Sequence, residues 1–212
     1  MIRPRLPTPQ HTTGPFFPAE FLESWESDLT AEPGGCGGGG DSDGGPAPRG
    51  ELIVLAGRVV DGVGEPAVNL ILELWQADSS GIFNHPGDPR YQERDPRFRG
   101  WGRAATEAHG RYRFVTVKPG PAPSGVDPGW VRPPHLAVML LGSGLMRPLI
   151  TQLFFPGEPL NATDRQLKEI VRPERRARLL LRRAGTDAQT GAQIYEMDFV
   201  LQGKGETPFL AG

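Results

Sequence analysis

The stretch ELIVLAGRVVD, Glu51–Asp61, begins a pattern of short apolar runs that continues almost to the end of the chain. Five later stretches have strand length and are rich in β-branched or aromatic residues: VNLILELWQAD (68–78), RYRFVTVKPG (111–120), HLAVMLLG (135–142), LITQLFFPG (149–157) and QIYEMDFVLQG (193–203). Turn residues such as Asp61-Gly62 separate them. Six or more strands at this spacing predict an all-β fold, an antiparallel β-sandwich or barrel.

The N-terminal quarter has a different composition, and we divide the chain accordingly into an extended arm (1–18), a linking region (19–50) and a β-domain (51–212). Prolines hold Thr8–Pro18 extended, a geometry suited to lying along a partner. The segment Glu20–Leu29 is predicted to form a short helix. Residues 33–50 contain nine glycines and almost nothing to bury, which predicts a flexible insert.

One helical segment interrupts the predicted strands, over Asp164–Ile170 and Pro173–Arg183. Pro173 suits the first turn of a helix, and Gly185 suits its end. Seven arginines lie between Arg165 and Arg183. Because no aromatic residues are interleaved with them, we interpret them as a solvated face partly paired with carboxylates rather than a nucleic-acid site.

Composition limits the possible partners and compartments. The chain has 212 residues and a formal net charge of −2, so it forms one main domain with no overall field that would attract nucleic acid or an anionic membrane. Cys36 is the only cysteine, which excludes an intrachain disulfide and suits a reducing cytoplasm. The N-terminus lacks the apolar region of a signal peptide, and the longest apolar run, Leu136–Leu141, is too short to span a bilayer. We therefore expect a cytoplasmic protein.

Several long blocks occur in one order: Thr8–Pro18, Gly57–His85, Asp95–Gly120, Arg132–Pro159 and Asp198–Leu210. Together they resemble the intradiol ring-cleavage dioxygenases, most closely the alpha subunits of the protocatechuate 3,4-dioxygenases. The resemblance implies a β-sandwich with its active site among the connecting loops. It also implies a ferric iron centre that binds a catechol and makes it reactive toward dioxygen.

Iron-bearing members of the family hold the metal with two tyrosines and two histidines, and this chain lacks most of them. RPPHLA keeps His135 of an RPAHIH-like motif but has Ala137 in place of the second histidine. KPGPAP places Ala122 where a tyrosine follows the KPGP turn. Tyr91 precedes Asp95 by four residues, one fewer than in the family motif. We therefore predict no metal ligand and no catalytic residue on this chain, with Tyr91 and His135 as possible vestiges, and we expect His135 to be a hydrogen-bonded structural histidine.

The resemblance implies that the N-terminal arm lines a substrate pocket. Thr12, Gly14 and Pro15 match the arm of the alpha subunits: a hydroxyl for hydrogen bonding, a backbone that allows close approach, and a rigid apolar wall. Ser143 replaces an arginine that in the family attracts the substrate's carboxylate, so it donates a hydrogen bond but no charge. Arg147 lies nearby in sequence. These residues leave the exact catechol open.

The predicted function is that of an alpha subunit paired with an iron-bearing protocatechuate 3,4-dioxygenase beta subunit. The resemblance implies that the complex opens protocatechuate with dioxygen to 3-carboxy-cis,cis-muconate, in aromatic catabolism through the beta-ketoadipate pathway. Fe³⁺ is then supplied by the beta subunit. Two alternatives remain: a self-sufficient dioxygenase that acts on another catechol, and a β-sandwich binding or scaffold module without catalytic function.

Overall fold

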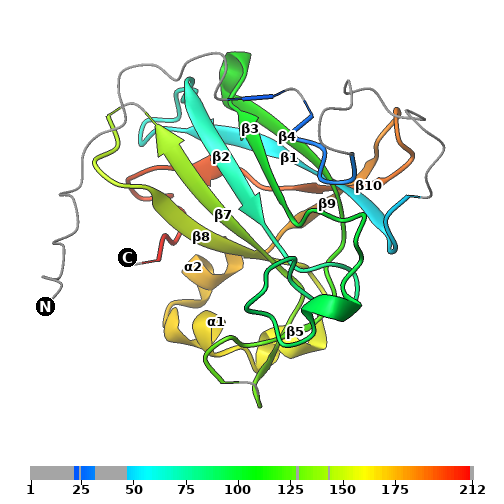
Figure 1. Ribbon diagram of the computed structural model, residues 1–212. Helices are drawn as coiled ribbons and strands as arrows, with labels where there is room; N and C mark the ends of the chain where they lie inside the picture. Colours follow the sequence, from blue (N-terminus) through cyan, green and yellow to red (C-terminus); the bar gives the residue numbers. More distant parts are fainter. Residues whose placement is uncertain (1–21, 24, 32–46, 128, 143, 211–212) are drawn as a thin grey trace, which may run out of the picture.

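A computed structural model describes residues 22–23, 25–31, 47–127, 129–142 and 144–210 of the chain. Two β-sheets face each other and enclose the core (Figure 1). The strands are β1 (Leu52–Val60), β2 (Leu70–Trp75), β3 (Trp101–Ala105), β4 (Arg111–Val117), β5 (Ala122–Pro123), β6 (Val131–Arg132), β7 (His135–Gly142), β8 (Leu149–Phe154), β9 (Arg182–Thr186), β10 (Gln193–Glu196) and β11 (Phe199–Val200). The helical elements are α1 (Arg165–Glu169), α2 (Pro173–Ala177) and the 3₁₀ turns η2 (Tyr91–Glu93), η3 (Ala108–Gly110) and η4 (Pro159–Ala162).

The predicted β-sandwich is confirmed, with one difference in strand direction. One sheet has the order β3-β2-β7-β8 and is antiparallel throughout. The other has the order β11-β1-β10-β9, with β4 also paired to β1. In this second sheet β1 runs antiparallel to β4 but parallel to β10 and β11. The sandwich is therefore mixed, because the last part of the chain returns beside β1 in the same direction.

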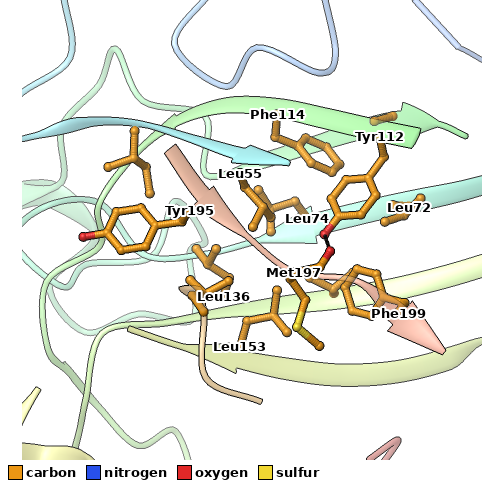
Figure 2. Close-up of a cluster of buried hydrophobic side chains, with 14 of the residues drawn as sticks. Leu55, Leu72, Leu74, Tyr112, Phe114, Leu136, Leu153, Tyr195, Met197 and Phe199 are labelled. Carbon is orange, nitrogen blue, oxygen red and sulfur yellow. Dashed lines mark hydrogen bonds between the residues drawn. The ribbon is translucent and has the colours of Figure 1, made fainter. Parts of the chain in front are cut away.

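The core lies between the sheets, as period-two patterning requires (Figure 2). Leu136, Val138 and Leu140 of β7 point into it, whereas the alternate residues His135 and Ala137 point to the outer face. The buried side chains labelled in Figure 2 come from both sheets and include Leu55, Leu72, Leu74, Phe114, Leu153, Tyr195 and Phe199. The outer face of the β3-β2-β7-β8 sheet therefore carries the sequence-predicted site positions of β7.

One tyrosine crosses this core and needs a polar partner there. The Tyr112 hydroxyl donates a 2.7 Å hydrogen bond to the Met197 carbonyl, drawn as a dashed line in Figure 2. Burial, and then the charges of Asp198 and Glu196, raise the pKa of Tyr112 well above its usual value of 10. Tyr112 is thus a structural phenol, joining β4 to the segment between β10 and β11.

The helix predicted over Glu20–Leu29 is not formed in the described part of that segment. Residues 25–27 form turns, and Asp28 forms a β-bridge with Val115. The Leu29 amide donates to the Val115 carbonyl at 2.9 Å, and the Leu29 side chain is fully buried. Completing the edge of the sheet and burying an apolar side chain outweigh a weak local helix propensity.

The second predicted helix is shorter than expected. It ends at Ala177, and Arg182 and Arg183 belong to β9. Gly185, with φ of +80°, lies in that strand rather than at a helix end. Three arginines of the segment pair with carboxylates as predicted: Arg165 with Asp127, Arg175 with Glu206 and Arg182 with Glu196. Within the described residues, no helix is long and apolar enough to cross a membrane.

Candidate functional site

The four positions matched to iron ligands, Tyr91, Ala122, His135 and Ala137, come from segments that gather at one end of the sandwich, where β5, α1 and the loop after β2 lie (Figure 1). Trp75, the last residue of β2, pairs with Trp101 of β3 on one side and with Ala137 of β7 on the other. Ala137 in turn pairs with Gln152 of β8. These register partners share the outer face of the sheet.

The loop after β2, residues 76–100, is held by buried carboxylates. Asp78, which is 3% exposed, accepts hydrogen bonds from the amides of Ser80, Ile82 and Asp95 at 2.8–3.0 Å. Asp95 accepts from the amides of Arg49 and Arg97. Burial alone would raise the pKa of Asp95, but these amides and the Arg49 charge outweigh it and hold the pKa below its usual value. The loop is therefore fixed by two buried carboxyl side chains that accept backbone amides.

This loop also touches the turn that carries Ala122. The Gly120 amide donates to the Asp78 carbonyl at 2.9 Å. Gly81 has φ of +75°, and a Cβ there would lie 1.9 Å from the Pro121 carbonyl oxygen. Only glycine permits this approach. The loop of Tyr91 and the KPGP turn are thus in contact, as a common site would need.

The side chains at these positions, however, do not come together in a common site. Tyr91 lies in η2, with the Arg94 guanidinium 3.9 Å from its ring centre. Its hydroxyl makes no hydrogen bond to another described residue. Ala122 is 2% exposed and pairs with Arg132 across the β5-β6 hairpin. Thr12, Gly14, Pro15 and Ser143 lie outside the described residues, so the predicted substrate positions stay predictions.

Arg132, for which no role was predicted, is the centre of this region. Its side chain is 8% exposed, and its Nε donates to Asp164 Oδ2 at 3.1 Å. Asp164 is fully buried. Nη2 of Arg132 donates to the side-chain oxygens of Gln152 at 2.7 Å and Gln166 at 2.8 Å. The guanidinium also lies near two aromatic rings, 5.2 Å from the ring centre of Trp130 and 5.9 Å from that of Phe154.

His135 is the fourth hydrogen-bond partner of this guanidinium. Its Nδ1 is 2.8 Å from the Pro133 carbonyl oxygen, which can only accept, so Nδ1 carries the proton. Nε2 then presents a lone pair, and Nη1 of Arg132 lies 3.2 Å from it. Burial, followed by the Arg132 charge, lowers the pKa of His135 to about 4. His135 is therefore neutral at neutral pH, as a hydrogen-bonded structural histidine should be.

Asp164 connects this Arg132 network, which also contains His135, Gln152 and Gln166, to the helical segment. It is the N-cap of α1, where its Oδ1 accepts the Leu167 amide at 3.0 Å while its other oxygen binds Arg132. One carboxylate thus caps a helix and neutralises a buried cation. Gln166, two residues later, adds a second contact from the same helix. The motif RPPHLA singled out His135 but not Arg132, and nothing in the sequence indicated that Asp164 and Gln166, 32 and 34 positions after Arg132, would bind that arginine.

A ferric centre does not fit this donor set. Of the four matched positions, two are alanines, and the third and fourth are Tyr91, whose contacts are local, and His135, whose metal-binding nitrogen faces a guanidinium. Among the described residues, no group of three or more His, Cys, Asp or Glu side chains is placed to hold a metal ion.

Comparison with known proteins identifies the fold's relatives. Residues 40–203 match the family described as Dioxygenase. The chain belongs to the intradiol ring-cleavage dioxygenase family. It is 38% identical to the protocatechuate 3,4-dioxygenase beta chain of Burkholderia cepacia over 97% of this chain and 85% of that one. It is also 35% identical to the alpha chain of Pseudomonas putida over 77% of this chain and 78% of that one.

A solved structure agrees with the sequence matches. The dioxygenase domain of a carbohydrate-binding fusion protein from Streptomyces sp. SirexAA-E superimposes with a TM-score of 0.59 and 26% identity, over 93% of this chain and 99% of that one. The predicted family and sandwich are thereby confirmed. The alpha chain of B. cepacia, at 31% identity, matches 95% of both chains. Intradiol family members thus resemble this chain over nearly its whole length.

Proposed function

We propose that this chain is an alpha-type, iron-free subunit of a heteromeric protocatechuate 3,4-dioxygenase. In the complex, a homologous beta subunit supplies the ferric iron, and dioxygen opens protocatechuate to 3-carboxy-cis,cis-muconate. The single observation that carries the proposal is the state of the donor positions: Ala122 and Ala137 offer no ligand, and the Nε2 atom of His135 faces the Arg132 guanidinium. Similarity to both alpha and beta chains supports a partner of the same family.

This chain's proposed contribution is the shape of the pocket. The arm residues Thr12, Gly14 and Pro15 would line the substrate cleft of the complex, and Ser143 would offer a hydroxyl where the substrate's carboxylate is bound. Serine lacks the charge of an arginine, which would weaken the hold on a carboxylate. A catechol with a different substituent is therefore the alternative substrate for the same complex.

A second candidate is a self-sufficient intradiol dioxygenase, favoured by one specific observation. Identity to the B. cepacia beta chain, 38%, exceeds identity to the two alpha chains, 35% and 31%. Overall identity, however, reports mainly on the shared scaffold, whereas metal binding depends on a few positions. We therefore give greater weight to the ligand positions.

Co-expression separates the candidates. The full chain is produced alone and together with a homologue, encoded nearby, that retains both tyrosines and both histidines; each product is tested for iron content, visible absorbance and oxygen uptake with protocatechuate. We expect the chain alone to be colourless and inactive, and the pair to copurify with about one iron per heterodimer. Stoichiometric iron and turnover by the chain alone would establish the second candidate. Failure to copurify with the homologue would favour a scaffold module instead.

A further inference from the structure

The segment Trp25–Leu29, which we call the strap, joins the two sheets at one side of the sandwich, beside β3 and β4 (Figure 1). The Glu26 carbonyl accepts the Arg103 amide of β3 at 3.0 Å. The Ser27 carbonyl accepts the Val115 amide of β4 at 2.9 Å. Because β3 and β4 are edge strands of different sheets, the strap closes the gap between their edges.

The sequence of β3 leaves room for the strap at Gly102. Leu29 is fully buried and belongs to the core cluster, so it supplies a side chain where β3 has none. A Cβ on Gly102 would lie 2.3 Å from the Glu26 carbonyl oxygen and 2.7 Å from Leu29 Cδ1. Since the φ of Gly102 is not positive, glycine is required here by the close approach of the strap and not by backbone conformation.

A second set of contacts ties the strap to the loop 76–100. Nη2 of Arg99 donates to the carbonyl oxygens of Asp28 at 2.6 Å and Trp25 at 3.3 Å. The guanidinium also lies 4.4 Å from the Trp25 ring centre. The strap is therefore held by the core, by two strand edges and by the loop that carries Tyr91.

We propose that the strap is a positioning element, which fixes where the predicted arm (1–18) leaves the sandwich and so keeps the arm within reach of the substrate cleft. This inference rests on the proposed function, in which the arm lines that cleft. Residues 19–24 alone separate the arm from the strap, a span of at most about 25 Å. Without the strap, the next anchored residue is Arg49, whose amide donates to Asp95 at 2.7 Å.

The length of free chain sets the size of the expected effect. Pro18, the end of the arm, is roughly seven residues from the strap but about 31 residues from Arg49. The effective concentration of a tethered group falls roughly as the −3/2 power of the length of a flexible tether. Release of the strap should therefore lower the effective concentration of the arm at the cleft about tenfold and raise KM by up to about tenfold.

The first test measures amide hydrogen exchange in the full chain alone. The amides of Arg103 and Val115 donate to the strap, so both should be protected. Leu29→Ala or Gly102→Val should accelerate their exchange at least about tenfold relative to amides in the centre of β7. Leu140→Ala is the matched control, because Leu140 is equally buried but lies two strands away from β3. Rapid exchange in the unaltered chain, or equal effects of the strap and control variants, would overturn the proposal.

The second test measures steady-state kinetics of the complex with the iron-bearing homologue. We expect Leu29→Ala and Gly102→Val to raise the KM for protocatechuate by up to about tenfold and to change kcat less than about threefold. Leu29→Met retains a long apolar side chain and should keep KM near its unaltered value. Leu140→Ala should leave KM unchanged, and an equal rise of KM in this control would show that general destabilisation is responsible.

Deletion of residues 1–17 separates this inference from the proposed function. In the deleted chain, Leu29→Ala should raise KM no further, because no arm is left to be positioned; a further rise would overturn the proposal. If the deletion raises KM but Leu29→Ala in the full chain does not, the inference about the strap fails and the proposed function stands. If the deletion leaves KM unchanged, the arm has no place in the cleft and the inference falls with it, whereas the iron content of the complex still tests the subunit assignment.

Discussion

Replacing Asp164 tests the energetic importance of the Arg132 network. Asp164 is fully buried, Arg132 is 8% exposed, and the carboxylate both pairs with the guanidinium and caps α1. Breaking a buried pair by removing one partner costs about 3–5 kcal/mol, because the other charge stays behind unpaired. Losing the helix cap adds about 1 kcal/mol. We therefore expect Asp164→Ala to lower the free energy of unfolding by at least about 4 kcal/mol, and Asp164→Asn by about 1 kcal/mol less.

Urea denaturation followed by circular dichroism measures these differences. With a slope of roughly 2–3 kcal/mol per molar urea, the Asp164→Ala midpoint should fall by more than about 1 M. Glu196→Ala is the matched control, because it breaks an ion pair at the surface: the Glu196 side chain is 36% exposed and that of its partner Arg182 is 73% exposed. This change should cost about 0–1 kcal/mol. If Asp164→Ala costs no more than this control, the network is not a structural centre. The double variant Arg132→Met/Asp164→Asn should be less destabilised than the sum of its single changes.

Three further outcomes are expected. The pKa of His135 is about 4 in the folded chain and about 6.5 in the unfolded chain, so as the pH falls the unfolded chain binds the proton first. The free energy of unfolding should therefore fall between pH 6.5 and pH 4, by up to about 3 kcal/mol. His135→Gln should remove that part of the pH dependence, and an unchanged profile would contradict this assignment. Tyr112→Phe should cost about 1–3 kcal/mol in urea unfolding by leaving the Met197 carbonyl unpaired, and no loss would show that another donor replaces the hydroxyl. Deleting residues 1–17 should raise the KM of the reconstituted complex, whereas deleting residues 34–47 should leave assembly and kinetics unchanged; equal kinetics for both deletions would remove the arm from the pocket.

The sequence predicted the strands that carry their own apolar pattern and missed those that do not. β2 and β7 are nearly continuous apolar runs, so strand length and β propensity identified them. β3, with the sequence WGRAA, and β9, with RRAGT, hold few apolar residues and exist because a neighbouring strand offers hydrogen bonds. The parallel pairing of β1 with β10 joins residues about 140 positions apart, a contact that no local pattern encodes.

The candidate site shows the same division between local and distant information. The alanines at two of the ligand positions led to the expectation that His135 is structural, and its hydrogen bond with the Pro133 carbonyl, two residues away, is a local contact. The state of its other nitrogen depends on Arg132, whose orientation is fixed by Asp164, Gln152 and Gln166. These partners lie on a strand and a helix that become neighbours only in the folded chain. The sequence could therefore predict contacts of His135 with residues near it in the chain, but not the contact of Nε2 that depends on distant residues.

The same reasoning explains how a chain can match a beta chain at 38% identity and still be proposed to lack its metal. Most identical positions in a sandwich maintain strand pairing and the core, and they change little when catalysis is lost. Loss of a ferric centre requires very few substitutions, but it leaves polar groups that were held by the ion. In this chain, His135 retains both of its hydrogen bonds, and Arg132 takes part in four side-chain contacts. A half-buried imidazole whose second nitrogen already has a hydrogen-bond partner therefore leaves no polar ring atom unsatisfied when no metal is bound.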